Sequence, residues 1–176
     1  MAKKQNDFLN EYVKLCQKGL GISPQKWMIG QRIENTSLFT HVYESLRRGQ
    51  GPWRAERIEI GDMRAEYNGW TIMIEYDNYK LTLSNLMKLW LFSTGKMDVQ
   101  PKQPIIICYF SDWKSYGSQR DIAEWFMTEF DKNKKKKVKI FFKQFDNLGK
   151  DSKSSKPTIL QSFDWIKDIV SGKNDK

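Results

Sequence analysis

The sequence predicts an α/β fold of the α+β kind, in which helices cover both faces of one mixed central sheet. Three observations support it. Apolar residues recur at every second position in the middle of the chain, and at every third or fourth position on either side of it. A continuous apolar run at 105–110 is typical of a strand that is buried on both faces of a sheet. The predicted strands are first consecutive and then alternate with helices, which indicates a three-strand antiparallel meander followed by helix, strand, helix and strand.

The N-terminal third predicts two helices. Asn6 can cap a helix over residues 7–18, whose apolar side chains form one stripe, and two glycines follow it. A second helix is expected over residues 37–48, because apolar residues again recur at helical spacing and the Gly-Gln-Gly-Pro segment 49–52 stops it.

The meander is expected at residues 53–60, 63–67 and 70–78, where the period changes to two. A helix over 82–92 follows, and its apolar face should pack on the sheet. The buried strand 105–110 begins after Pro104.

A helix over 118–132, a strand over 138–145 and a helix over 158–170 complete the predicted order. The length suits one core, so residues 1–172 are expected to form a single domain. The lysine-containing end, 173–176, is expected to be a disordered basic tail.

The charge of the chain favours a polyanionic partner. It has 176 residues, a formal net charge of +9 and a pI near 9.4, which suits nucleic acid, although a lysine-rich composition alone would give the same excess. No apolar run approaches the roughly 18 residues that cross a bilayer, and no signal peptide is evident, so a cytoplasmic protein without a membrane partner is expected. Cys16, Cys108 and the single His41 do not make a zinc site or a nucleophile triad.

The most informative segment is a predicted hairpin. Asn68-Gly69 is a strong signal for a two-residue type I′ turn, because both residues tolerate positive φ. The turn pairs Tyr67 with Trp70, and stepping outward places Asp62 opposite Glu75.

Asp77 lies on the same strand face as Glu75, so three carboxylates are expected to gather. Mg²⁺ and Mn²⁺ prefer such oxygen ligands, and the backbone carbonyl of Tyr76 could add another. The alternative is that these acids line a solvent face, as Glu66 could on the neighbouring strand. A central strand makes that alternative costly, because its second face is usually covered by a helix.

Gly61-Asp62, the Asn-Gly hairpin, the acids Glu75 and Asp77, the following helix and the buried strand resemble the PD-(D/E)XK nuclease superfamily. Asp62 matches the first aspartate of the motif and Glu75 the second acid. Gly61 stands where proline is usual, and Asp77 stands where lysine is usual.

The resemblance implies a metal-dependent phosphodiester hydrolase, an endonuclease that uses Mg²⁺ or Mn²⁺, with DNA as the more common substrate of the family. Asp62, Glu75, Asp77 and the Tyr76 carbonyl would bind metal, and Asp77 could instead orient the water. In some members a helix lysine replaces the motif lysine, which makes Lys88 a catalytic candidate; its alternative is a solvent-facing residue. Glu44 is similar in position to an accessory metal-site glutamate.

Two alternatives to an enzyme stay open. The first is a catalytically inactive module with the nuclease fold that binds nucleic acid or a protein partner, and the second is a small protein that acts on another protein. A homodimer or larger complex is an expectation by analogy alone. Cations near aromatic residues are the candidates for nucleic-acid contact, namely Arg47, Arg48, Arg54, Lys114 and Arg120.

Overall fold

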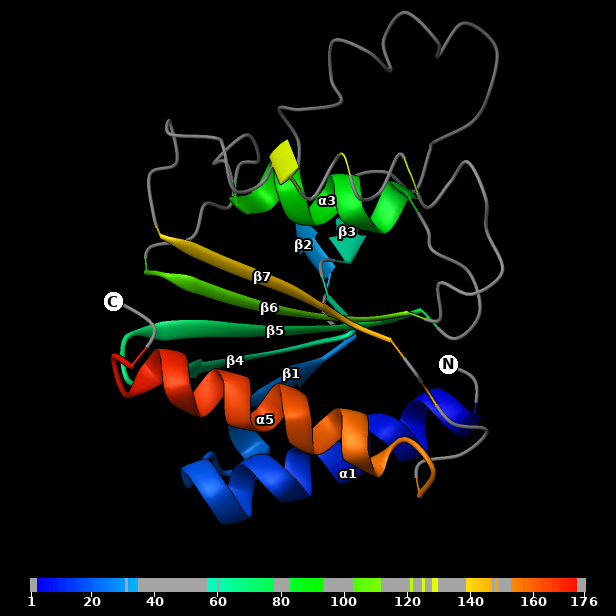
Figure 1. Cartoon of the computed structure of the whole chain (residues 1–176). Coiled ribbons are helices and arrows are strands. Elements are labelled where there is room, and N and C mark those ends of the chain that lie inside the picture. Colours follow the sequence, from blue (N-terminus) through cyan, green and yellow to red (C-terminus); the bar gives the residue numbers. More distant parts are fainter. Residues whose placement is uncertain are drawn as a thin grey trace, which may run out of the picture.

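The protein is an α+β domain with a five-stranded mixed sheet and helices on both faces, as Figure 1 shows for this computed structural model. The predicted fold class is therefore confirmed. The structure describes residues 3–30, 32–34, 57–59, 61–77, 83–93, 103–111, 121, 125, 128–129, 139–146, 148 and 153–173.

The described elements follow one another from an N-terminal to a C-terminal helix. In chain order they are α1 (Lys3–Leu20), the 3₁₀ turn η1 (Pro24–Lys26), β1 (Trp27–Ile29), β2 (Arg32–Glu34), β3 (Arg57–Glu59), β4 (Met63–Tyr67), β5 (Trp70–Asp77), α3 (Leu83–Ser93), β6 (Ile105–Ser111), β7 (Ile140–Phe145) and α5 (Lys156–Val170).

The main sheet has the strand order β1-β4-β5-β6-β7. Its first three strands are antiparallel neighbours, whereas β5, β6 and β7 run parallel to one another. Strand β5 is therefore the central strand, with an antiparallel neighbour on one side and a parallel one on the other.

The third antiparallel strand is not the predicted segment 53–60. Of that segment the structure describes Arg57–Glu59, which pairs with β2 in a separate two-stranded sheet, while β1 takes the place beside β4. A strand of three residues is too short to show a period of two, so no local pattern distinguishes β1 from a loop.

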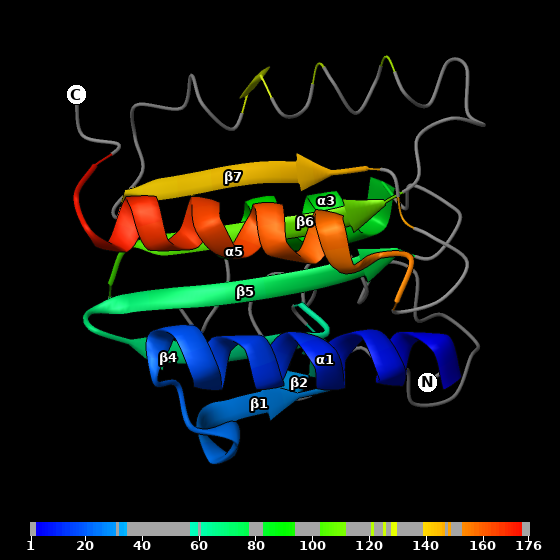
Figure 2. The same ribbon diagram turned by 60° about the horizontal axis from the view of Figure 1, so that its bottom comes forward.

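The two faces of β5 pack against different helices. Ile72, Ile74 and Tyr76 point into the main core, which α1 and α5 cover. The alternate residues, including Met73 and Glu75, point to the face that α3 covers. Figure 2 shows α1 and α5 crossing the first of these faces.

Aromatic rings form the centre of the α1–α5 side of the core. The ring of Phe8 lies 4.4 Å from that of Tyr76 and 4.8 Å from that of Phe110, measured between centroids. Phe110 in turn stacks 5.3 Å from Phe145. These contacts join α1 to three strands of the sheet. The end of β5 that carries Glu75 and Asp77 is therefore packed against aromatic rings on the α1–α5 face.

A small polar group lies inside this core. The hydroxyl of Ser162 donates to the Tyr12 hydroxyl at 3.1 Å, and Tyr12 donates to the sulfur of Cys108 at 3.8 Å. Both cysteines are fully buried and free, as expected for small apolar side chains. Burial raises the pKa of the Cys16 thiol from 9.0 to about 12, and burial also raises the pKa values of Tyr12 and Cys108.

These pKa shifts predict a loss of stability at alkaline pH. An unfolded Cys16 releases its proton near pH 9.0, whereas the folded protein holds it until about pH 12. The folded state thus binds more protons across that window, and the free energy of unfolding falls as pH rises through it. We expect Cys16→Ala to make the decline shallower by up to about 1.4 kcal/mol per pH unit. Urea unfolding at pH 8 to 11 measures this, and an unchanged slope would contradict it.

Most predicted elements are found within one to four residues of their expected ends. This applies to α1, β4, β5, α3, β6, β7 and α5. The predicted helix 37–48 lies outside the described residues, as does most of the predicted helix 118–132, whose described positions 121, 125 and 128–129 are helical.

At the C-terminus Lys173 donates its backbone N–H to the carbonyl of Asp168 at 2.9 Å, and residues 174–176 lie outside the described residues. Among the helices that the structure describes, none is both long and apolar enough to cross a membrane.

Candidate functional site

The hairpin that carries the site forms as predicted. Asn68 and Gly69 have φ values of 47° and 79°, as a type I′ turn requires, and Tyr67 pairs with Trp70. The register continues to the pair Met63 and Ile74. Asp62 directly precedes β4, and its carboxylate accepts from the backbone N–H of Tyr76 on β5.

Polar side chains collect where the parallel strands end. Glu75 and Asp77 on β5 pair with Tyr109 and Ser111 on β6, and all four lie on the face that α3 covers. In open α/β sheets, ligands bind outside the carboxyl ends of the strands. This end of the sheet is therefore the place where a ligand is expected.

Asp62 is held by two hydrogen bonds that come from different elements. The side-chain amide of Gln5, in the first turns of α1, donates to one carboxylate oxygen at 2.6 Å. The backbone N–H of Tyr76 donates to the other at 2.7 Å. Both donors are neutral, so they fix the direction of the carboxylate without cancelling its charge.

Gly61 has a structural reason to replace the proline of the resembled motif. Its φ is +71°, whereas the proline ring locks φ near −65°. A Cβ at this position would also lie 3.4 Å from the carbonyl oxygen of Ile74. Glycine thus lets the chain turn into β4 while Asp62 stays close to β5.

Glu75 is a buried carboxylate, with 5% of its surface exposed. It lies on the central strand of the sheet, under α3. Burying a carboxylate is costly unless hydrogen bonds, an opposite charge or a metal ion compensate for the lost hydration. Functional sites often contain such groups, because their charge acts strongly in a dry environment.

Asp77 is engaged differently from the other two acids. The amide of Asn85 on α3 donates to one of its oxygens at 3.0 Å, and the hydroxyl of Tyr109 donates to the other in a close hydrogen bond. Within the described residues there is no group of three or more His, Cys, Asp or Glu side chains that could hold a metal ion. The structure thus does not gather Asp62, Glu75 and Asp77 into one ligand set.

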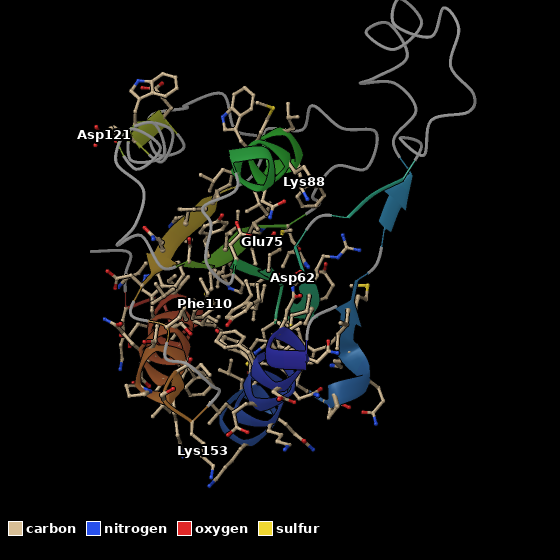
Figure 3. The ribbon with its side chains drawn as sticks, turned by 90° about the vertical axis from the view of Figure 1, so that its right-hand side faces the viewer. Asp62, Glu75, Lys88, Phe110, Asp121 and Lys153 are labelled. Carbon is tan, nitrogen blue, oxygen red and sulfur yellow. The ribbon has the colours of Figure 1, made fainter. Side chains whose placement is uncertain are left out.

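Lys88 belongs to the same region. It is half-buried on α3, one helical turn after Asn85. Figure 3 shows Lys88 on the helix above Glu75 and Asp62, while Lys153 lies on the opposite side of the molecule. The other predicted site residues, Glu44, Arg47, Arg48, Arg54, Lys114 and Arg120, lie outside the described residues.

Sequence reasoning did not find Gln5, Asn85 or Tyr109, because their contacts with the acids join separate helices and strands, and local patterns do not determine how those elements pack. It could have found Arg64, which β4 places opposite Met73, on the face of the sheet that α3 covers. Arg64 is half-buried, and its guanidinium contacts the sulfur of Met28 at 3.7 Å. A thioether is a weak acceptor, whereas a guanidinium binds anions strongly.

Comparison of the chain with protein-family models, with curated proteins and with solved structures finds no match.

Proposed function

We propose that this protein is a metal-dependent phosphodiester hydrolase, an endonuclease that acts on DNA. The observation that carries the proposal is the pair of Asp62 and Glu75. One carboxylate is fixed by two hydrogen bonds and the other is buried, and Asp62 accepts from the backbone N–H of Tyr76, the residue that follows Glu75 on the central strand.

The pair suits Mg²⁺ or Mn²⁺ in its chemistry. These ions take hard oxygen ligands, and Mg²⁺ commonly binds through one or two carboxylates plus waters and the phosphate of the substrate. Asp62 and Glu75 would hold the ion, with the Tyr76 carbonyl as a further ligand. When bound, the ion would activate water for attack and offset the charge that develops on the phosphate.

Residues of the chain would orient the metal-binding carboxylate and the phosphate of the substrate. Gln5 and the Tyr76 N–H hold the carboxylate of Asp62, as the partners of metal ligands commonly do. Lys88 can place a positive charge over the pair from α3. Arg64 can donate two hydrogen bonds to a phosphate, the geometry that guanidinium favours.

The charge of the whole chain supports a nucleic-acid substrate over a small phosphoester. A net charge of +9 attracts a polyanion of any sequence, through release of the counterions that surround it. The Asp62–Glu75 pair is acidic, so a phosphodiester would approach it only with a cation present.

Incubation of plasmid and linear DNA with the protein and Mg²⁺ or Mn²⁺ tests the proposal. We expect cleavage that EDTA stops and that Asp62→Ala lowers by at least roughly a thousandfold, because the metal supplies several kcal/mol and each 1.4 kcal/mol is a factor of ten. Asp164→Ala is the matched control, since Asp164 is an exposed acid on α5. Cleavage that survives Asp62→Ala would overturn the assignment.

A second candidate function is a module that binds nucleic acid without cutting it. The hydrogen bonds that Asn85 and Tyr109 make to Asp77, with no group of three acids in the described part of the chain, favour this alternative. It predicts metal-independent DNA binding and no cleavage. If Arg64 contacts a phosphate, Arg64→Gln should lower the slope of log affinity against log salt by about one.

A further inference from the structure

We propose that Asp77 is a positioning residue that fixes helix α3, and through it Lys88, over the Asp62–Glu75 pair. The inference rests on the proposed function for the role of Lys88. It assigns to the third motif position a task other than metal binding.

The contacts of Asp77 connect three elements. Its carboxylate on β5 accepts one hydrogen bond from Asn85 on α3 and one from Tyr109 on β6. Strands β5 and β6 are already paired through the backbone, with Glu75 beside Tyr109. The bond to Asn85 therefore adds a link between the sheet and the helix that covers it.

That link adds a directional constraint to the apolar packing of α3. Leu86, Leu89 and Phe92 are buried between α3 and its surroundings, so they determine which side of the helix faces inward. Apolar contacts tolerate small shifts better than hydrogen bonds do, because the hydrophobic effect itself is non-directional. A hydrogen bond depends on distance and angle, and the Asp77–Asn85 contact thus sets both.

Lys88 is one turn beyond Asn85, on the same side of the helix. A fixed position of Asn85 therefore also fixes the backbone position of Lys88. Figure 3 shows this lysine on the helix above Glu75. The cation that the resembled motif carries on the strand would here come from α3.

The hydrogen-bond partners of position 77 suit an aspartate in place of the motif lysine. Both neighbours present donors to it, a hydroxyl from Tyr109 and an amide from Asn85. An ionised carboxylate is an acceptor only, whereas a lysine ammonium has no acceptor to offer. A lysine at this position could keep these contacts only if both reversed direction, with the Tyr109 hydroxyl oxygen and the Asn85 side-chain carbonyl accepting instead.

Exchanging the two side chains tests the inference. Asn85→Asp alone sets two carboxylates against each other and should lower kcat by roughly a hundredfold, the size of effect that a misplacement of about 1 Å can cause. Asp77→Asn keeps one acceptor oxygen but loses the charge that strengthens the hydrogen bond, so its loss of kcat should be smaller, roughly tenfold. The double variant restores an amide opposite a carboxylate, so we expect kcat within about tenfold of the original. A metal ligand at position 77 would not be rescued, because the carboxylate would have moved to α3. Asp164→Asn, the same change on the exposed face of α5, is the control.

Two further readouts separate positioning from a general structural role. Titration with Mn²⁺ should give an affinity within about threefold of the original in Asp77→Asn, whereas Asp62→Asn should remove binding. In a Lys88→Met background, Asp77→Asn should lower kcat no further, because the two changes act through one group. Loss of Mn²⁺ binding in Asp77→Asn, or full additivity with Lys88→Met, would overturn the inference.

Hydrogen exchange keeps the inference testable if the protein does not cleave DNA. Amides of α3 should exchange faster in Asp77→Asn, with α1 and α5 unchanged, and the double variant should recover their protection. Such a result would support the positioning role even if the proposed function failed. Unchanged protection of α3 would overturn it.

Discussion

Replacing Glu75 with glutamine is expected to abolish both metal-dependent cleavage and the stabilisation of the protein by Mg²⁺. The side chain keeps its size in this variant, so the core around it is preserved. It loses the negative charge with which, in the proposed function, Asp62 and Glu75 together would attract a divalent ion.

Thermal unfolding with and without Mg²⁺ measures this effect. An ion present at a hundred times its dissociation constant stabilises the folded state by about 2.7 kcal/mol, which corresponds to a rise in Tm of roughly 5–10 °C for a chain of this length. Glu75→Gln should show no rise. Glu66→Gln, an exposed glutamate on β4 that accepts a bond from Thr71, should keep it. A rise retained in Glu75→Gln would contradict the metal assignment.

Phe110→Ala is expected to cost about 3–5 kcal/mol of the free energy of unfolding, the usual range for a phenylalanine removed from a core. Phe110 has no exposed surface, and its ring contacts Phe8, Tyr12 and Phe145. Figure 3 marks its position in the structure. The variant would leave a cavity between α1 and the sheet, beneath the strand ends that carry the candidate site.

Urea unfolding gives the size of this loss, and Leu160→Ala on α5 is the comparison. Leu160 has 39% of its surface exposed, so its truncation should change stability by less than about 1 kcal/mol. Equal effects of the two changes would show that the Phe8–Phe110–Phe145 contacts do not form the centre of the core.

Local patterns were enough to predict the hairpin and most of the helices. The Asn68-Gly69 turn depends on the φ preferences of two adjacent residues, and it sets the register of β4 and β5. The stripe of α1 and the apolar run of β6 likewise depend on residues close in sequence. These features were predictable because neighbouring residues alone determine them.

The parts that could not be predicted depend on contacts between distant residues. Strand β1 joins the sheet through pairing with β4 across more than thirty residues, a choice that a three-residue segment does not encode. Gln5 reaches Asp62 only because α1 packs under the hairpin. Asn85 is close to Asp77 in sequence, but it meets Asp77 only because α3 packs back over the sheet, which the local pattern does not determine.

The strand register predicted for the site is found as far as the pair Met63 and Ile74, and among the described residues no group of three acids forms a possible metal site. The sequence placed Glu75 and Asp77 on one face, and they lie there, yet the partners of Asp77 direct its carboxylate to Asn85 and Tyr109. The resemblance to the PD-(D/E)XK superfamily stays a prediction. Measurements of metal binding and DNA cleavage in Asp62 and Glu75 variants would test it.

The position of Mn²⁺ in a crystal of the protein, located by its anomalous scattering, tests the central claim most directly. We expect an ion bound by the carboxylates of Asp62 and Glu75, at metal–oxygen distances of about 2.1 Å, with Asp77 still bonded to Asn85 and Tyr109. An ion bound by Asp77 without Asp62, or no ion at saturating Mn²⁺, would contradict it.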